Sequence, residues 1–376
     1  MKLTIIIDQI ANDLGGTEGQ IVKLIKGLSV QHQIDLIVFQ RSDWLVKARE
    51  WLPCQVEIIE LGGITKPAFY RGLWQLYRLL RNRQPDVVHT FFPIANVVGV
   101  LMARMARIKG VLASRRDYGY WITPGYLKAT RFANRFVDSI VVNSPQVCAF
   151  TERVEEVPRD RLEVIYNGVD LQALHRDQPN LALKEQLGIP LHHKVISLVA
   201  NYRPIKRHDT LLHATRQLLD KHPDISLLFV GANNAADPCM DEVLSLAKEL
   251  GLQDRVYRGH AKGDIAEYLS IMDIGCNCSE SEGLSNAVIE YMAAGVASVV
   301  SNGGGNPDLV NDEIDGMVFP VGDHGALAEK LDRLLSDEEL RKKLAQAGQD
   351  KVKREMALDV MLDRFERHYK SVARLT

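Results

Sequence analysis

The segments Leu3-Thr4-Ile5-Ile6-Ile7 and Val195-Ile196-Ser197-Leu198-Val199-Ala200 decide the fold, because each opens a series of short apolar runs separated by helix-length amphipathic stretches. Runs that are apolar on both faces are typical of parallel strands covered by helices on each side. We therefore predict an α/β fold with two doubly wound, Rossmann-like sheets. The expected strands are residues 3–7, 34–39, 56–61, 87–89, 111–113 and 140–142, then 195–200, 227–230, 256–257, 274–276 and 296–300.

A polar stretch after Asn167-Gly168-Val169-Asp170 separates the two series. We expect residues 1–172 to form a first domain and residues 173–358 a second one. Residues 336–375 have helical spacing and heavy charge, and we expect the helix at 359–376 to pack back on the first domain. Open α/β sheets bind ligands beyond the carboxyl ends of their strands, so two sheets facing each other form a cleft suited to two substrates.

The composition excludes several classes of protein. The 376 residues are 46% hydrophobic and 25% charged, unlike a disordered or collagen-like chain. The 46 basic and 48 acidic side chains exclude a polycation that coats nucleic acid. Five scattered cysteines indicate a reducing compartment. There is neither a signal-peptide core nor a run of 18 apolar residues, so we expect a cytoplasmic protein.

The most informative segment for chemistry is residues 279–295, between two expected strands. We expect residues 283–286 to turn into a helix whose unpaired backbone N–H groups favour an anion or sugar hydroxyls. If the helix included both Glu282 and Glu290, the two carboxylates would lie about 80° apart around its axis and could accept hydrogen bonds from several hydroxyls. The competing interpretation is a capped surface helix with solvated acids.

Three cations, Arg203, Lys206 and Arg207, follow the first strand of the second series. Fixed cations at a strand end stabilise the charge that develops on a leaving diphosphate. A solvated basic loop is the alternative.

Other motifs are weaker. Gly15 and Gly16 follow the first strand and would let a ligand approach the backbone, but no dinucleotide fingerprint or phosphate loop is present. Cys276-Asn277-Cys278 has no second ligand pair at the right spacing, and we interpret His192-His193 as part of a loop. We therefore expect no metal.

Together these segments resemble the retaining GT-B glycosyltransferases of the GT4 family, the glycosyl transferases group 1. The resemblance covers nearly the whole chain in order. The matching segments are Gly15-Gly16-Thr17-Glu18, Val141-Val142-Asn143-Ser144, residues 164–170, 203–209 and 282–295, and residues 303–310 with 316–320.

The resemblance implies transfer of a sugar from a nucleotide diphosphate sugar, a UDP- or GDP-sugar, with retention of configuration and without a metal or other cofactor. It places Glu282 on the donor sugar and Glu290 on the ribose, and Arg203 and Lys206 at the leaving diphosphate. This chain has Asn201 where the family commonly has Arg. The backbone groups expected at the donor belong to Gly15, Gly16, Val256, Gly283, Leu284, Ser285 and Asn286.

On the acceptor side the family often has a His after its fifth strand, where this chain has Ser114-Arg115-Arg116-Asp117. An arginine pair suits an anionic acceptor. Asp117 would either orient the acceptor hydroxyl or pair with Arg116, and His89 is a further candidate on this side.

Residues 66–135 contain many Lys and Arg residues, opposed only by Asp86 and Asp117, with aromatic residues between them. Such a surface is attracted to anionic lipid. We therefore expect the first domain to contact the inner face of the cell membrane and to take a sugar or a lipid-linked or anionic acceptor. A solvated basic surface is the alternative, and nucleic acid is disfavoured because no binding module accompanies the patch.

The sequence thus predicts a retaining hexosyltransferase of bacterial cell-surface polysaccharide or glycolipid synthesis. Two rivals stay open. A nucleotide-sugar 2-epimerase on the same fold would turn over the donor alone, and a non-catalytic nucleotide-sugar binding subunit would not need Glu282.

Overall fold

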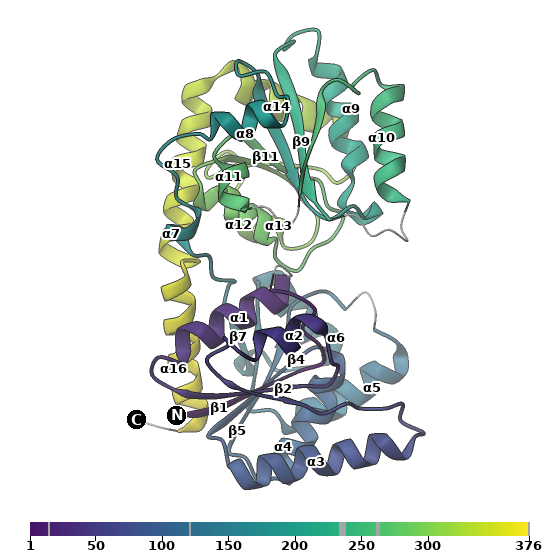
Figure 1. Cartoon of the computed structure of the whole chain (residues 1–376), viewed down its shortest axis with the longest axis vertical. Helices are drawn as coiled ribbons and strands as arrows, with labels where there is room; N and C mark the ends of the chain where they lie inside the picture. The colour runs from purple at the N-terminus through teal and green to yellow at the C-terminus, as the bar shows by residue number, and fades with distance from the viewer. Residues whose placement is uncertain (14–15, 120–121, 233–237, 261–263, 375–376) are drawn as a thin grey trace. The chain divides into compact units, whose positions relative to one another are not determined.

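The computed structural model describes residues 1–13, 16–119, 122–232, 238–260 and 264–374, and the chain divides into two compact units (Figure 1). Unit 1 comprises Met1–Gly168 and Leu358–Thr376, and unit 2 comprises Val169–Ala357. The chain therefore leaves unit 1 after Gly168 and returns to it for its last helix.

In the described part of unit 1, seven parallel strands form a sheet of order β3-β2-β1-β4-β5-β6-β7. The strands are β1 (Lys2–Ile7), β2 (Gln33–Val38), β3 (Gln55–Ile58), β4 (Val87–Phe91), β5 (Gly110–Arg115), β6 (Ser139–Val142) and β7 (Leu162–Val164). The helices are α1 (Gly16–Leu28), α2 (Asp43–Ala48), α3 (Pro67–Arg83), η1 (Ala95–Gly99), α4 (Val100–Met105), α5 (Pro124–Ala133), η2 (Asn134–Phe136), α6 (Pro145–Glu155), η3 (Arg159–Arg161) and α16 (Leu358–Ala373).

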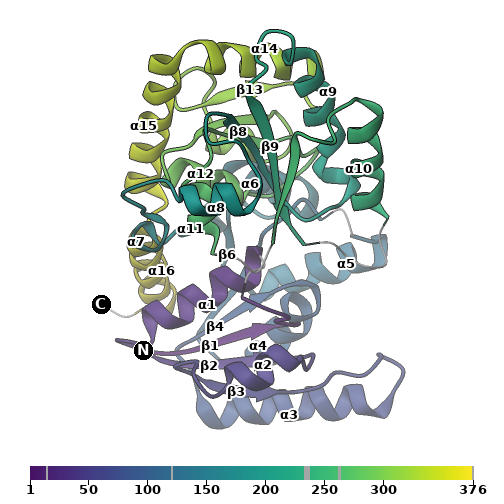
Figure 2. The same cartoon turned by 45° about the horizontal axis from the view of Figure 1, so that its top comes forward.

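The alternation of side chains along β1 divides the core of unit 1 between the two faces of the sheet. Ile5 and Ile7 belong to an apolar cluster with α1 and α16, whereas Ile6 belongs to a second cluster with α3 and α4. Figure 2 shows α1 and α3 on opposite sides of the strands.

In the described part of unit 2, six parallel strands form a sheet of order β10-β9-β8-β11-β12-β13. The strands are β8 (Lys194–Val199), β9 (Ile225–Gly231), β10 (Val256–His260), β11 (Ile274–Asn277), β12 (Ala297–Ser301) and β13 (Met317–Phe319). The helices are α7 (Leu171–Leu174), α8 (Leu181–Gln186), η4 (Pro204–Lys206), α9 (His208–Leu218), α10 (Cys239–Glu249), α11 (Ile265–Leu269), α12 (Asn286–Ala293), α13 (Asn306–Leu309), α14 (His324–Ser336) and α15 (Glu338–Glu355). Helices α9 and α10 lie on one side of the strands, and α11 and α12 lie on the other (Figure 1).

The predicted fold class, two parallel α/β sheets, is confirmed. The sequence patterns missed β7 and β13, which are edge strands of three residues each and too short to show a pattern. Both sheets reverse their strand order once, between β1 and β4 and between β8 and β11. The described helices include none that combines the length and the apolar character needed to cross a membrane.

Candidate functional site

The candidate site lies at the carboxyl ends of β8 and β11, the two strands between which the order of the second sheet reverses. The chain leaves β8 toward η4 and α9, and it leaves β11 toward α12. Because the two connections run to opposite sides of the sheet, they part at this edge and leave room for a ligand. The acidic segment and the basic loop predicted from the sequence are these two connections.

Lys206 and Glu282 meet at this edge. The Lys206 ammonium forms an ion pair with Oε1 of Glu282, and the two side chains are 23% and 12% exposed. Burial by itself would raise the pKa of Glu282, but the Lys206 charge and the hydrogen bonds to the carboxylate hold its pKa below the usual value. Glu282 is therefore ionised at neutral pH.

A buried polar network fixes the carboxylate of Glu282. Its Oε1 atom accepts hydrogen bonds from Ser279 Oγ at 2.6 Å and from Asn277 Nδ2 at 3.2 Å. Asn277 Nδ2 also donates to Ser285 Oγ at 2.9 Å, and Asn277 Oδ1 accepts from Asn306 Nδ2 at 3.2 Å. The sequence analysis missed Asn277 and Asn306, because their role is visible only once four chain segments meet.

Helix α12 begins at Asn286, with Ser285 as its N-cap. Glu282 therefore lies outside the helix, the condition for placing Glu282 and Glu290 about two turns apart on one helix is not met, and only Glu290 projects from α12. The fully buried Tyr291 ties α12 to the sheet, because its hydroxyl accepts a 2.6 Å hydrogen bond from the backbone N–H of Val199 at the end of β8. Gly283 and Leu284 lie in the turn between Glu282 and the N-cap.

The glycine segment, residues 303–305, follows β12 and packs against the backbone of residues 279–282. Gly304 has a φ of +57°, and a Cβ atom there would lie 2.3 Å from the backbone oxygen of Glu282. At Gly303 a Cβ would lie 2.5 Å from the oxygen of Ser279. The backbone N–H of Gly305 donates to the Glu282 oxygen at 2.7 Å. Glycine is required because the two backbones touch.

The remaining donor-side candidates are distributed as follows. Arg203 is exposed, whereas Arg207 is engaged by Asp209 and by Glu280 at 2.8 Å. Val256 starts β10 at the amino end of that strand, on the edge opposite the Lys206–Glu282 pair. Gly16 is the first residue of α1. Gly15 lies outside the described residues.

On the acceptor side, the structure places His89 and Arg115 within the interior of unit 1. His89 is 1% exposed and its ring is held by Tyr369 Oη and Ser114 Oγ, both at 2.8 Å. Burial lowers the pKa of His89 well below its usual value, so its ring is neutral. Arg115 forms two hydrogen bonds with the carboxylate of Glu155, at 2.7 and 2.8 Å. The Arg115 guanidinium is therefore held by the Glu155 carboxylate inside unit 1.

Arg116 and Asp117 do not pair with each other. Arg116 Nη2 donates to Asn167 Oδ1 at 2.6 Å, and Asp117 Oδ1 accepts from the backbone N–H of Gly119 at 2.7 Å. Burial lowers the pKa of Arg116 to about 10, so it stays charged at neutral pH.

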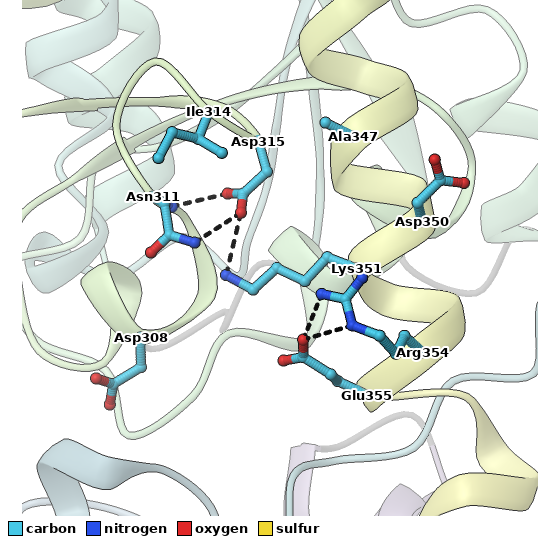
Figure 3. Close-up of a pocket in the computed structure, with 9 residues that line it drawn as sticks. All are labelled: Asp308, Asn311, Ile314, Asp315, Ala347, Asp350, Lys351, Arg354 and Glu355. Carbon is cyan, nitrogen blue, oxygen red and sulfur yellow. Dashed lines mark hydrogen bonds and ion pairs between the residues drawn. The ribbon is translucent and has the colours of Figure 1, made fainter.

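A separate pocket of about 540 Å³ lies in unit 2 between α15 and residues 308–315 (Figure 3). Lys351 crosses it, and its ammonium donates to the backbone oxygen of Leu309 at 2.6 Å and lies 3.3 Å from Asp315 Oδ2. Asp315 also accepts from the backbone N–H of Asn311 at 2.7 Å. The buried charges of this pocket thus stabilise the loop that follows the glycine segment.

Comparisons with known proteins identify the family of this chain. The model of "Glycosyltransferase Family 4" matches residues 14–173, and that of "Glycosyl transferases group 1" matches residues 180–351. The chain is 24% identical over 294 residues to N-acetyl-alpha-D-glucosaminyl L-malate synthase of Bacillus anthracis, which covers 77% of this chain and 75% of that protein. It is 24% identical over 281 residues to the UDP-Gal:alpha-D-GlcNAc-diphosphoundecaprenol alpha-1,3-galactosyltransferase of Escherichia coli, covering 72% of this chain and 71% of that one.

Among solved structures, Anabaena HepE in complex with UDP matches with a TM-score of 0.87 at 19% identity, over 99% of this chain and 100% of that chain. The fold is thus that of the GT-B glycosyltransferases. The chain belongs to the GT4 family, the glycosyl transferases group 1, as its sequence predicts. It uses a nucleotide-sugar donor.

Proposed function

We propose that this enzyme transfers a hexose, with retention of configuration, from a UDP- or GDP-sugar bound by unit 2 to a lipid-linked or otherwise anionic acceptor bound by unit 1. The observation that carries the donor assignment is the Lys206–Glu282 pair at the switch point of the second sheet. UDP is the first choice of nucleotide, because the Anabaena neighbour was crystallised with UDP and the E. coli relative is named for UDP-Gal.

The three hydrogen-bonding groups that hold Glu282 all reach its Oε1 atom. We propose that Oε2 accepts a hydrogen bond from a hydroxyl of the donor sugar, since this bond would leave the network at Oε1 undisturbed. The Lys206 ammonium has three donors and can hold Glu282 and a diphosphate oxygen together. Exposed Arg203 lies in the same loop and would add a second charge as the sugar–phosphate bond breaks. The departing phosphate would take the acceptor's proton.

The acceptor assignment rests on charge. Arg116 directly follows β5 and keeps its charge, and its side-chain hydrogen bond goes to the neutral amide of Asn167, so we assign the anionic acceptor to this cation of the predicted pair. The names of the two relatives include an anionic group. The Bacillus anthracis enzyme is named for L-malate, and the Escherichia coli enzyme is named for a diphosphoundecaprenol. Both support an anionic acceptor here.

Contact with the cytoplasmic face of the membrane is part of the proposal. Helix α3 buries Gly72, Leu76 and Leu80 and turns its other face outward. Trp74 is 56% exposed, and the Arg78 guanidinium lies 4.6 Å from the centre of its ring. Basic residues beside exposed aromatic rings suit the interface of an anionic bilayer.

A thermal-shift titration tests the donor assignment, since a ligand that binds the native state raises the melting temperature in a concentration-dependent way. UDP or GDP should stabilise the wild type, and Lys206→Ala should lose most of that shift. Lys221→Ala is the matched control, because Lys221 pairs with Asp332 elsewhere on unit 2. If neither nucleotide stabilises the protein, or if the two variants respond alike, the donor assignment fails. Turnover of the nucleotide sugar to an epimer without acceptor would identify the epimerase instead.

Liposome flotation tests the membrane contact. The wild type should float with vesicles that contain anionic lipid, and less so as salt is raised. Arg71→Ala/Arg78→Ala/Arg81→Ala on α3 should sediment, whereas Lys342→Ala/Lys343→Ala on α15 should float like the wild type. Absence of flotation at any salt concentration would contradict the proposal.

A further inference from the structure

A cluster of metal-ligating side chains lies at the amino ends of β8 and β9. His192 and His193 directly precede β8, and Asp224 directly precedes β9. One potential ligand atom from each residue lies within 4.8 Å of the other two. The strands pair with Lys194 opposite Ile225, so the register of the sheet brings these residues together. Because β8 is six residues long, the cluster is about 20 Å from the Lys206–Glu282 pair.

We propose that His192, His193 and Asp224 form a binding site for a divalent transition-metal ion, with Zn²⁺ as the expected metal. The Nε2 atoms of His192 and His193 lie 3.5 and 3.9 Å from Asp224 Oδ1. Ligand atoms of a tetrahedral zinc, with bonds of about 2.0–2.1 Å, lie roughly 3.3 Å apart. The observed spacing therefore needs only small side-chain rotations, which His192 and Asp224 can make because both are exposed.

His193 is oriented in advance. It is buried, and its Nδ1 atom bonds to Oγ of the fully buried Ser226 at 2.9 Å, which leaves Nε2 directed at Asp224. Metal-binding histidines are typically held in this way through their second ring nitrogen.

The backbone around the cluster is fixed as well. The Lys184 ammonium donates to the backbone oxygen of His193 at 2.7 Å. The backbone N–H of Lys194 donates to the backbone oxygen of Asp224 at 2.9 Å. The positive charges of Lys184 and Arg255 lie nearby and oppose a dication. Asp224 offsets one charge, so we expect a site weaker than a four-ligand structural zinc site, completed by water. Imidazole and carboxylate ligands suit zinc better than magnesium or calcium.

Isothermal titration with ZnCl₂ tests the site in untagged protein that has been treated with EDTA. The wild type should bind one Zn²⁺, and His192→Ala should remove most of the affinity without affecting folding, since this side chain is exposed. Ser226→Ala keeps all three ligands and should weaken binding by about tenfold, because the His193 ring loses its orientation. His175→Ala is the matched control, because His175 also pairs with an exposed acid, Asp177, but among the described residues it belongs to no cluster of three ligands.

The absorption spectrum of Co²⁺ in the same proteins reports the ligand set directly. Intense visible bands in the wild type that disappear in His192→Ala would support the site. The proposal would be overturned if titration of the wild type with Zn²⁺ gave no heat of binding, or if the wild type and His192→Ala had equal dissociation constants for Zn²⁺. Neither readout depends on transferase activity.

Discussion

Lys206 and Glu282 form an ion pair across the carboxyl edge of the second sheet, although 76 positions separate them in the sequence. Strands β8 and β11 are adjacent and parallel, so the residues that follow their carboxyl ends meet at this edge of the sheet. The pair presents one cation and one anion to the same space, which is what a diphosphate joined to a sugar requires. The predictions below begin with this contact.

Removing the cation should destabilise the folded protein. Lys206→Ala leaves the Glu282 carboxylate buried without its counter-charge, and we expect a loss of about 2 kcal/mol in the free energy of unfolding at neutral pH. Urea denaturation measures it. Lys221→Ala should lose almost nothing, because its ion pair with Asp332 is largely exposed.

The pH dependence of this effect follows from the pKa of Glu282. Its folded-state pKa is depressed in the wild type, so the stabilisation is complete above the unfolded pKa of about 4.3 and is lost as pH falls through the folded pKa. In Lys206→Ala the lowering effect of the Lys206 charge is lost, and we expect burial to raise the pKa of Glu282 above its wild-type position. The stability difference between the two proteins should therefore be largest near neutrality and shrink toward about pH 4. A constant difference would contradict the assigned charge state.

Replacing the carboxylate should impair the reaction more than donor binding. Glu282→Gln keeps the shape of the side chain but loses the charge that we assign to the donor sugar, and we expect kcat to fall about 10²- to 10³-fold. Steady-state kinetics with the donor give kcat, and the thermal shift with UDP gives binding. Glu280→Gln, two residues away and paired with Arg207, should keep near-normal kcat. Equal activity in both variants would remove Glu282 from the mechanism.

The glycine segment offers a test of backbone contact. Gly304→Ala would place a Cβ 2.3 Å from the Glu282 oxygen at a φ of +57°, and it should cost at least about 3 kcal/mol. Gly251 has a similar φ of +69° with no atom within 4 Å of its Cβ position, so Gly251→Ala carries only the backbone strain, about 1 kcal/mol. Thermal or urea unfolding compares them. Similar costs would show that the contact with Glu282 is unimportant.

Arg115, the last residue of β5, and the adjacent Arg116 should behave differently. Arg115→Gln leaves Glu155, which is 3% exposed, without its cation and should cost about 3–5 kcal/mol of stability. Arg116→Gln loses one hydrogen bond to Asn167, at about 1 kcal/mol, and should raise the KM for an anionic acceptor. Unfolding curves and acceptor kinetics below the melting temperature separate the two roles. An unchanged acceptor KM in Arg116→Gln would remove Arg116 from the acceptor site.

Sequence reasoning identified the two connections of the candidate site but not what supports them. Asn277 was read only as the centre of a Cys276-Asn277-Cys278 run, yet its amide bonds to Glu282 and Ser285. The sequence also could not show that Arg115 is held by Glu155, 40 positions away. Such partners are fixed by strand order and by the positions of helices, which no local pattern records.

The sequence by itself determined the α/β class, the two sheets and the family, because apolar periodicity and short motifs depend only on neighbouring residues. Only the tertiary structure decided which charges meet: Lys206 with Glu282, Arg115 with Glu155, and the two histidines with Asp224. The physical reason is that a charge interacts through space, and the space between two residues is set by the register of distant strands.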